Sequence, residues 1–254
     1  MGKVDYDRRM HEVYAAGRAL SPGGTAAWME SFARRVPTRR PLGVVDLGSG
    51  TGRFTPALAD TFGGPVYGVE PSSGMRGVGQ REAAHPAVTY LAGGAEAIPL
   101  PADSCDLALL FFVWHHVDDR PRAVQELDRV LRAEGRILIR SNFSDRMPEL
   151  SMYEHFARAR EVDAALYPTF DEMVASFKSA GFGYSALDVV RVQVASTERE
   201  AFERLRLRAI STFEFMEEEE LPWGFAAMES ALTERGDRGP VFEEAMLLTL
   251  ARER

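Results

Sequence analysis

The chain has 254 residues, a formal net charge of −8 and one cysteine. A negative net charge argues against a general nucleic-acid binder, which normally carries a basic surface, and a single cysteine excludes an intramolecular disulfide. The longest apolar run, Leu107 to Trp114, is too short to span a bilayer, and the first residues contain no apolar signal core. We therefore expect a cytoplasmic protein, a monomer or homodimer, that binds neither nucleic acid nor membrane.

The N-terminal segment predicts two amphipathic helices before the first strand. Tyr6, Met10 and Val13 recur at helical spacing, and a second stripe begins at Trp28 after a break at residues 21–24. Strands and helices then alternate as far as residue 140. The expected strands are residues 43–47, 66–70, 88–91, 107–113 and 136–140. A helix expected from Pro121 to Gly135 joins the last two of them.

The order of elements changes after residue 140. The elements expected there are a helical insertion at 144–167, a capped helix at 169–181, a strand at 190–194, a long helix at 197–216, a helix at 223–235 and a strand at 245–251. The alternation before residue 140 is typical of an open, doubly wound parallel sheet. We therefore predict an α/β fold with a doubly wound, mostly parallel seven-stranded sheet and a helical cap.

The cap is expected to collect the segments that do not fit the alternating pattern. We expect a single domain over residues 1–254. Its core is expected to comprise about 42–140, 168–196 and 240–254, and its cap 1–37, 141–167 and 197–239. In this topology small molecules bind beyond the carboxyl ends of the strands.

A glycine-rich turn follows the first expected strand. Asp46 is followed by Gly48, Gly50 and Gly52. Glycine allows a sharp strand-to-helix turn and lets a ligand approach the backbone. The glycines alternate, and Arg53 stands where the dinucleotide fingerprint needs its last glycine, so a nicotinamide cofactor is not favoured. The pattern favours a bound ligand over a simple tight turn.

A carboxylate ends the second expected strand. Glu70 lies 24 residues after Asp46, and an acidic side chain at this place can accept hydrogen bonds from both hydroxyls of a ribose. If Glu70 binds the ribose of a nucleoside in this way, Pro71 and Ser72 would lie next to the adenine of the same nucleoside. The other interpretation, a solvent-exposed strand-end glutamate, is weaker because the glycine turn precedes it.

The turn from Asp46 to Gly52 resembles the first motif of class I S-adenosylmethionine (SAM)-dependent methyltransferases. Similar segments follow in order: Gly93–Pro101, Asp103–Asp106, Trp114–Val117 and Glu126–Arg136. The series resembles small-molecule methyltransferases related to the ubiquinone/menaquinone C-methyltransferases, and it covers about residues 43–140. The resemblance implies a Rossmann-like methyltransferase fold, SAM as methyl donor and S-adenosylhomocysteine as product. The lone cysteine and the scattered histidines give no recognisable zinc spacing, so no metal is expected, although the adjacent His115 and His116 leave an adventitious site open.

One departure from the family pattern concerns adenine recognition. Gly94 replaces the acidic residue that usually meets the adenine amine, so the backbone near Ala95 or the Glu96 carboxylate is expected to replace that contact. The expected cofactor-binding set is Asp46, Gly48, Ser49, Gly50, Gly52, Glu70, Pro71, Ser72, Ala95, Glu96, Phe111, Phe112, Tyr14 and Arg18. Arg18 could pair with the carboxylate of SAM; the alternative is an aromatic core stripe at Tyr14 and a surface arginine.

Two adjacent histidines follow the fourth expected strand. His116, or less favourably His115, could act as general base if the acceptor must lose a proton; otherwise one of them packs against its neighbours or orients a loop. Arg140, Asn142 and Arg208 are the expected substrate-binding residues. Arg140 or Arg208 could hold an anionic acceptor bidentately, unless these arginines are solvated. The aromatic and methionine-rich cap suggests an apolar, aromatic or polycyclic small-molecule acceptor, although ordinary core packing explains most of those residues.

The sequence leaves other functions open. A protein of this fold could bind SAM without transferring a methyl group, as a regulatory partner or in a cofactor-assisted rearrangement. A nicotinamide-dependent dehydrogenase is the third possibility, against which Arg53 counts.

Overall fold

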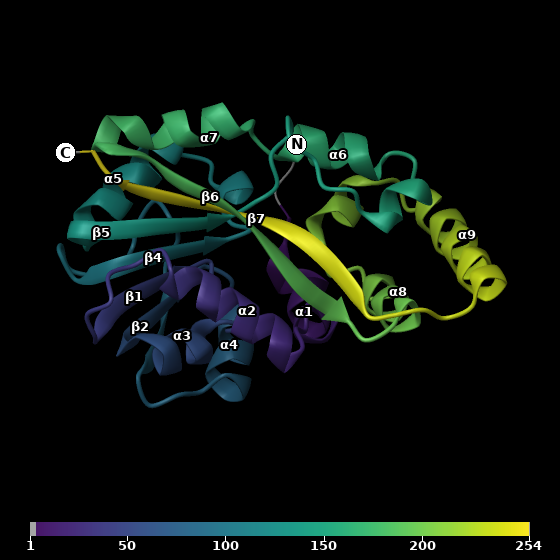
Figure 1. Cartoon of the computed structure of the whole chain (residues 1–254), viewed down its shortest axis with the longest axis horizontal. Helices are drawn as coiled ribbons and strands as arrows, with labels where there is room; N and C mark the ends of the chain where they lie inside the picture. Colours follow the sequence, from purple (N-terminus) through teal and green to yellow (C-terminus); the bar gives the residue numbers. More distant parts are fainter. Residues whose placement is uncertain (1–3, 254) are drawn as a thin grey trace.

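The computed structural model describes residues 4–253, so the expectations for residues 1–3 and 254 lie outside the described residues. One mixed sheet runs through the molecule with strand order β3-β2-β1-β4-β5-β7-β6 (Figure 1). Its strands are β1 Leu42–Leu47, β2 Gly63–Glu70, β3 Val88–Ala92, β4 Cys105–Phe111, β5 Leu131–Arg140, β6 Phe182–Ala195 and β7 Val241–Arg252. The predicted doubly wound, mostly parallel seven-stranded sheet is confirmed.

The central strands determine at which edge of the sheet a ligand is expected to bind. All six residues of β1 are buried, as in a strand covered on both faces. At its carboxyl end Leu47 lies beside Val69 of β2 and Leu110 of β4, and these pairs are parallel. Only β7 runs against its neighbours, since it pairs antiparallel with both β5 and β6. Strand order reverses between β1 and β4, where a ligand crevice is expected.

Helices cover both faces of the sheet. The α-helices are α1 His11–Gly17, α2 Pro22–Ala33, α3 Thr55–Phe62, α4 Ser73–Glu82, α5 Arg120–Val130, α6 Ala159–Leu166, α7 Phe170–Phe177, α8 Glu198–Arg206 and α9 Glu220–Arg235. Trp28 of α2 and Phe62 of α3 pack with Leu107 in one apolar cluster. Leu127 of α5 and Phe177 of α7 belong to the cluster on the other face.

The cap forms a smaller apolar cluster at one end of the molecule. The buried residues there include Phe156 before α6, Phe202 of α8, Phe213 between α8 and α9, and Leu232 of α9. Strands β6 and β7 extend past the other strands towards this end, and α8 and α9 lie beyond them (Figure 1). The two helices that were expected between the last two strands are therefore present.

Two helix boundaries differ from the sequence prediction. The expected long helix at 197–216 is wrong: α8 ends at Arg206, Arg208 has a left-handed φ of 54°, and a separate 3₁₀ turn spans Ser211–Phe215. The helix expected to reach Gly135 ends at Val130, because Leu131 is already extended and pairs with Cys105. In both cases packing outweighs an apolar helical periodicity.

The described residues contain no helix long and apolar enough to cross a membrane.

Candidate functional site

The turn between β1 and α3 depends on its glycines. Gly48, Gly50 and Gly52 have φ values of 68°, 56° and 79°, which side chains rarely adopt. A Cβ on Gly48 would lie 2.5 Å from a methyl carbon of Val113, so the turn also requires a bare backbone there. The amide of Gly48 donates to the Val69 carbonyl at 2.8 Å. These constraints keep the backbone exposed to the cavity at the carboxyl end of β1.

Glu70 holds the same turn from the neighbouring strand. One carboxylate oxygen accepts a hydrogen bond from the Gly50 amide and the other from the Ser72 amide, both at 2.9 Å. The side chain is 7% exposed, and burial raises its pKa while the two amide hydrogen bonds lower it. Because a carboxylate offers about four acceptor positions, both oxygens can still accept from ligand hydroxyls.

Asp46 stabilises the same turn through a contact with the helix that follows it. Its carboxylate is buried and accepts a hydrogen bond from the Thr55 hydroxyl at 2.7 Å, at the first residue of α3. Burial raises the pKa of Asp46 to about 6. Asp46 does not line the cavity, so its contact fixes the start of α3 relative to β1.

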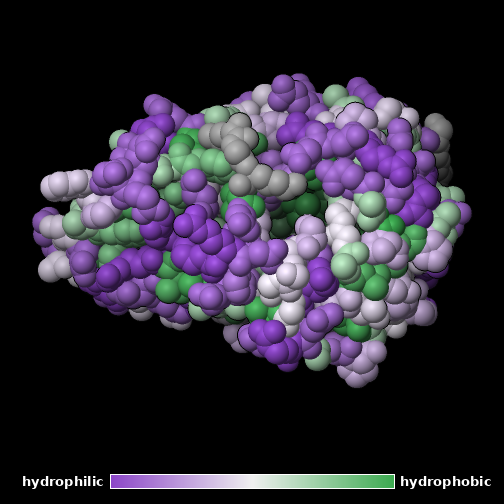
Figure 2. Space-filling view, turned by 180° about the vertical axis from the view of Figure 1, so that it is seen from behind, coloured by the Kyte–Doolittle hydropathy of each residue, from purple (hydrophilic) through white to green (hydrophobic). Residues whose placement is uncertain are grey.

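A cavity opens over these groups. Predicted cofactor residues that line it are Tyr14, Gly48, Gly50, Glu70, Pro71, Ala95, Glu96, Phe111 and Phe112. Four predicted residues, Asp46, Ser49, Gly52 and Ser72, do not line this cavity, and Arg18 lines a second cavity. Val4, Tyr6, Met75 and Val113 also line the first cavity, although they were not predicted to do so. Seen from behind, the molecule is hollowed near its middle, and the floor of the hollow is apolar (Figure 2).

The N-terminal segment is anchored beside this cavity. The Asp7 carboxylate accepts hydrogen bonds from the Ser72 hydroxyl and the Gly74 amide, both at 2.7 Å, at the start of α4. The Gly74 amide contributes most to lowering the pKa of Asp7, followed by the Ser72 hydroxyl. One residue before, the Tyr6 hydroxyl lies 2.8 Å from His116 Nε2. No local sequence pattern predicts such contacts, because the partners are more than 60 residues apart.

The two histidines occupy different environments. His116 lines the first cavity. His115 packs against Tyr167, with ring centroids 4.7 Å apart, and burial, aided by the neighbouring His116, lowers its pKa well below the ordinary value. His115 lines neither cavity among the described residues, which favours its structural interpretation.

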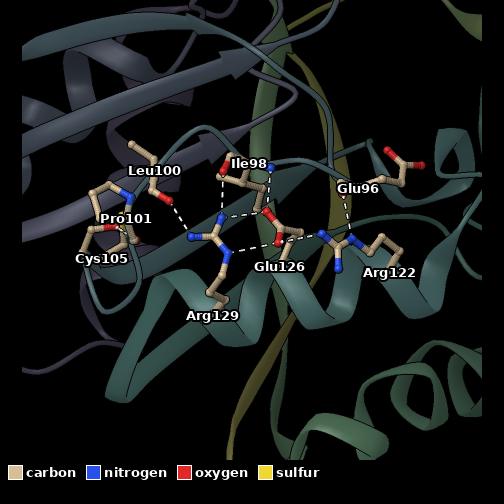
Figure 3. Close-up of polar contacts among 9 residues, drawn as sticks. Glu96, Ile98, Leu100, Pro101, Cys105, Arg122, Glu126 and Arg129 are labelled. Carbon is tan, nitrogen blue, oxygen red and sulfur yellow. Dashed lines mark hydrogen bonds and ion pairs between the residues drawn. The ribbon is translucent and has the colours of Figure 1, made fainter.

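The loop that follows β3 is held by α5. Glu126 accepts from the Ile98 amide at 2.9 Å and is paired with Arg129 at 2.7 Å (Figure 3). Arg129 donates in turn to the carbonyls of Ile98 and Leu100. This network fixes the loop that carries Ala95 and Glu96 to the cavity.

A second cavity shares Phe111 and Phe112 with the first. Phe112 has a left-handed φ of 58°, a strained conformation for an aromatic residue and one that clusters at functional sites. Its ring lies under two guanidinium groups, Arg140 at 4.3 Å and Arg18 at 5.6 Å. The cavity is therefore next to the glycine turn but separated from it by two aromatic side chains.

The expected substrate-binding residues are not brought together. Arg140 lines the second cavity, and Asn142 lies behind it and accepts a hydrogen bond from its guanidinium at 3.0 Å. Arg208 lines neither cavity; it pairs with Glu218 at 2.6 Å. Arg208 was predicted to lie on a long cap helix. That helix, α8, ends at Arg206, and Arg208 has a left-handed backbone instead.

Comparison with known protein families shows which proteins this chain resembles. Residues 45–139 match a family described as a methyltransferase domain. This segment of the chain is therefore similar to a methyltransferase domain. It is 39% identical over 125 residues to an uncharacterized methyltransferase of Mycobacterium bovis, covering 49% of this chain and 46% of that protein. This match thus spans about half the length of that relative.

The matches to other methyltransferases cover a larger share of the chain. A demethylmenaquinone methyltransferase of Anoxybacillus flavithermus is 27% identical over 203 residues, which cover 70% of this chain and 83% of that protein. The relation to the ubiquinone/menaquinone C-methyltransferases expected from the methyltransferase motifs is confirmed. The structure of phosphoethanolamine N-methyltransferase 2 of Haemonchus contortus with SAM shares the fold, with a TM-score of 0.64, 18% identity, and coverage of 100% of this chain and 61% of that chain.

Glu126→Gln should destabilise the methyltransferase domain in a pH-dependent way. Arg129 lowers the pKa of Glu126, so its ionised form stabilises the fold above the ordinary pKa, and this contribution is lost as the pH falls through the lowered pKa. We expect urea unfolding at pH 7 to show a loss of about 1–3 kcal/mol, and the difference from wild type to shrink in acid. Glu134→Gln, at an exposed residue, is the control; a difference that persists in acid would contradict the ion-pair explanation.

Asp7→Ala should weaken cofactor binding without unfolding the protein. The substitution removes the acceptor that holds the N-terminal segment on α4, and Tyr6 and Tyr14 of that segment line the first cavity. We expect the Kd for S-adenosylhomocysteine to rise roughly three- to tenfold by calorimetry. Arg8→Ala, an exposed substitution in the same turn, should leave it unchanged. An unchanged Kd in Asp7→Ala would show that the anchor does not matter for binding.

Proposed function

We propose that this protein is a SAM-dependent methyltransferase that transfers a methyl group to a small molecule. The observation that carries the proposal is the pair of adjoining cavities that share Phe111 and Phe112. One contains the glycine turn and Glu70, and the other is formed mainly by the cap and the ends of β6 and β7. Donor and acceptor would meet at the shared aromatic wall. The match of residues 45–139 to a methyltransferase domain supports this assignment.

The residues of the first cavity fit SAM. Gly50 leaves space that a side chain would take, since its Cβ would come within 3.2 Å of Met75. Glu70 would accept the ribose hydroxyls, and the loop at Ala95 and Glu96 would face the adenine. SAM supplies an activated methyl group on a sulfonium when bound. The protein's own task is then to align the acceptor and exclude water, and positioning alone can contribute about 7–11 kcal/mol in favourable cases.

The second cavity would hold the acceptor. Its apolar wall includes Trp28, Val192 and Leu205, which suit an aromatic or polycyclic body. Binding in such a cavity removes water from the acceptor and restricts its orientation. Because the shared wall is formed by residues at and just after the end of β4, the acceptor would approach at the carboxyl edge of the sheet.

His116 is the proposed general base. It lines the first cavity, and its Nε2 lies against the Tyr6 hydroxyl, which can hold the ring orientation. A neutral imidazole can accept a proton from a phenol, hydroxyl or amine. His115 is the weaker candidate because its ring packs against Tyr167 and lines neither cavity among the described residues.

Transfer itself is tested with labelled SAM and extracts of the source cell. We expect a labelled small molecule and release of S-adenosylhomocysteine. Binding of SAM without release of S-adenosylhomocysteine across acceptor pools would favour a regulatory or non-methylating role. Failure to bind either SAM or S-adenosylhomocysteine at millimolar concentration would overturn the proposal.

Glu70→Gln should selectively remove recognition of the ribose. The amide has one acceptor oxygen where the carboxylate has two, so it cannot serve both backbone amides and both hydroxyls. We expect the Kd for adenosine to rise about 10- to 100-fold, whereas that for 2′,3′-dideoxyadenosine should change little. Glu82→Gln, outside the first cavity, is the control. Equal losses for both nucleosides would indicate a disturbed turn instead of a lost ribose contact.

His116→Gln should lower kcat for an acceptor that loses a proton. General bases contribute about 100- to 10,000-fold, so we expect at least a tenfold fall while the Kd for S-adenosylhomocysteine stays close to that of wild type. The wild-type rate should rise with pH and level off, and the variant should lack that step. His85→Gln provides the matched histidine control away from the cavities. A variant with an unchanged pH profile would exclude His116 as the base.

A further inference from the structure

The second cavity contains guanidinium groups that have no carboxylate partner. Arg18, Arg53 and Arg140 line it, and none of them forms an ion pair within residues 4–253. Arg204 also lines the cavity, but it is paired with Glu200 and donates to the carbonyls of Ala19 and Val194. The cavity is therefore cationic, in a chain whose net charge is −8.

Arg140 is held in place with donors to spare. It is 5% exposed, and one of its terminal nitrogens donates to the Ser141 carbonyl at 2.7 Å and to Asn142 Oδ1. Its Nε and second terminal nitrogen have no hydrogen-bond partner among the described residues. The face of the guanidinium lies over Phe112. The neighbours thus fix the orientation of Arg140 and leave part of its planar donor fork available.

Arg53 is held in a similar way. It donates from one terminal nitrogen to the Arg18 carbonyl at 3.0 Å, and it lies over the rings of Phe54 and Phe111 at 4.7 and 4.8 Å. The pKa of both Arg53 and Arg140 is lowered to about 10, chiefly by burial and in smaller part by the positive charge of Arg18. Among the described lining residues the only carboxylate is Glu243, on β7. The cavity therefore favours a bound negative charge.

SAM does not supply enough negative charge. It carries a sulfonium and an ammonium against one carboxylate, so binding it adds positive charge beside the cavity. If Arg18 pairs with that carboxylate, Arg53 and Arg140 still form no ion pair within the described part of the chain, although Asp46 and Glu243 act on them at longer range. On the basis of the proposed function, we propose that the methyl acceptor carries an anionic oxygen group, a carboxylate or a phosphate ester, on an apolar body, and that Arg140 and Arg53 bind that group. The apolar body would lie against Leu20, Trp28 and Ile210.

The test uses three probes that share one apolar ring system: 1-naphthoate, 1-naphthyl phosphate and the neutral naphthalene-1-carboxamide. Each is titrated by calorimetry into protein saturated with S-adenosylhomocysteine. We expect at least one anion to bind about tenfold or more tightly than the carboxamide. The stronger of the two anions distinguishes a carboxylate from a phosphate acceptor. Equal binding of all three probes would overturn the proposal.

Two substitutions assign the effect to this cavity. Arg140→Gln should weaken binding of the anion by about tenfold or more and leave the carboxamide unchanged. Glu243→Gln, at an exposed residue, should strengthen binding of the anion several-fold, so the test survives if the buried Arg140 variant does not fold. Arg206→Gln, which removes an exposed ion pair on α8, should have no effect. Binding of the anion that is insensitive to both Arg140→Gln and Glu243→Gln would overturn the assignment.

Competition separates this inference from the proposed function. If the anionic probe displaces S-adenosylhomocysteine, the guanidinium groups serve the carboxylate of the cofactor and the inference is wrong. If S-adenosylhomocysteine does not bind at all, the proposed function fails. The probes alone then still report whether the cavity selects an anion.

Discussion

The Glu70 carboxylate is the contact on which the rest of the site depends. It joins the turn after β1 to the turn after β2 through the amides of Gly50 and Ser72. Because Ser72 also donates to Asp7, the N-terminal segment is fixed to the same two turns. Tyr6 then reaches His116 from that segment. A buried carboxylate with two amide donors thus links four separate parts of the chain around one cavity.

The aromatic side chains at the end of β4 divide the space beyond the sheet. Phe111 and Phe112 each contribute to both cavities, and each lies under a guanidinium group. The strained backbone of Phe112 is consistent with a position fixed by function rather than by folding alone. These two side chains thus form a wall between two adjoining cavities of different lining.

Local signals in the sequence predicted the sheet and about half of the residues that line the first cavity. The glycine spacing and the acidic end of β2 depend on steric rules that act over a few residues, and so does the capping box at Thr169, which is present with both of its hydrogen bonds. Contacts between distant segments had no such signal. Asp7, Tyr6 and Arg53 were not expected at the cavities, because their neighbours there come from other parts of the fold. The cap was the least predictable part, since the apolar spacing that suggested one long helix is shared by α8 and a separate turn that pack on one cluster.

The extended pair of strands β6 and β7 has an evolutionary consequence. Both strands are anchored in the sheet, and α8 and α9 are inserted between them in the sequence. Many residues that line the second cavity, including Val192, Leu205, Ile210 and Ala245, come from this one continuous stretch of chain. The stretch can accumulate substitutions, or be exchanged as a block, without altering the glycine turn or Glu70. Substitutions within this single segment can therefore change the second cavity in the course of evolution while the lining of the first cavity stays the same.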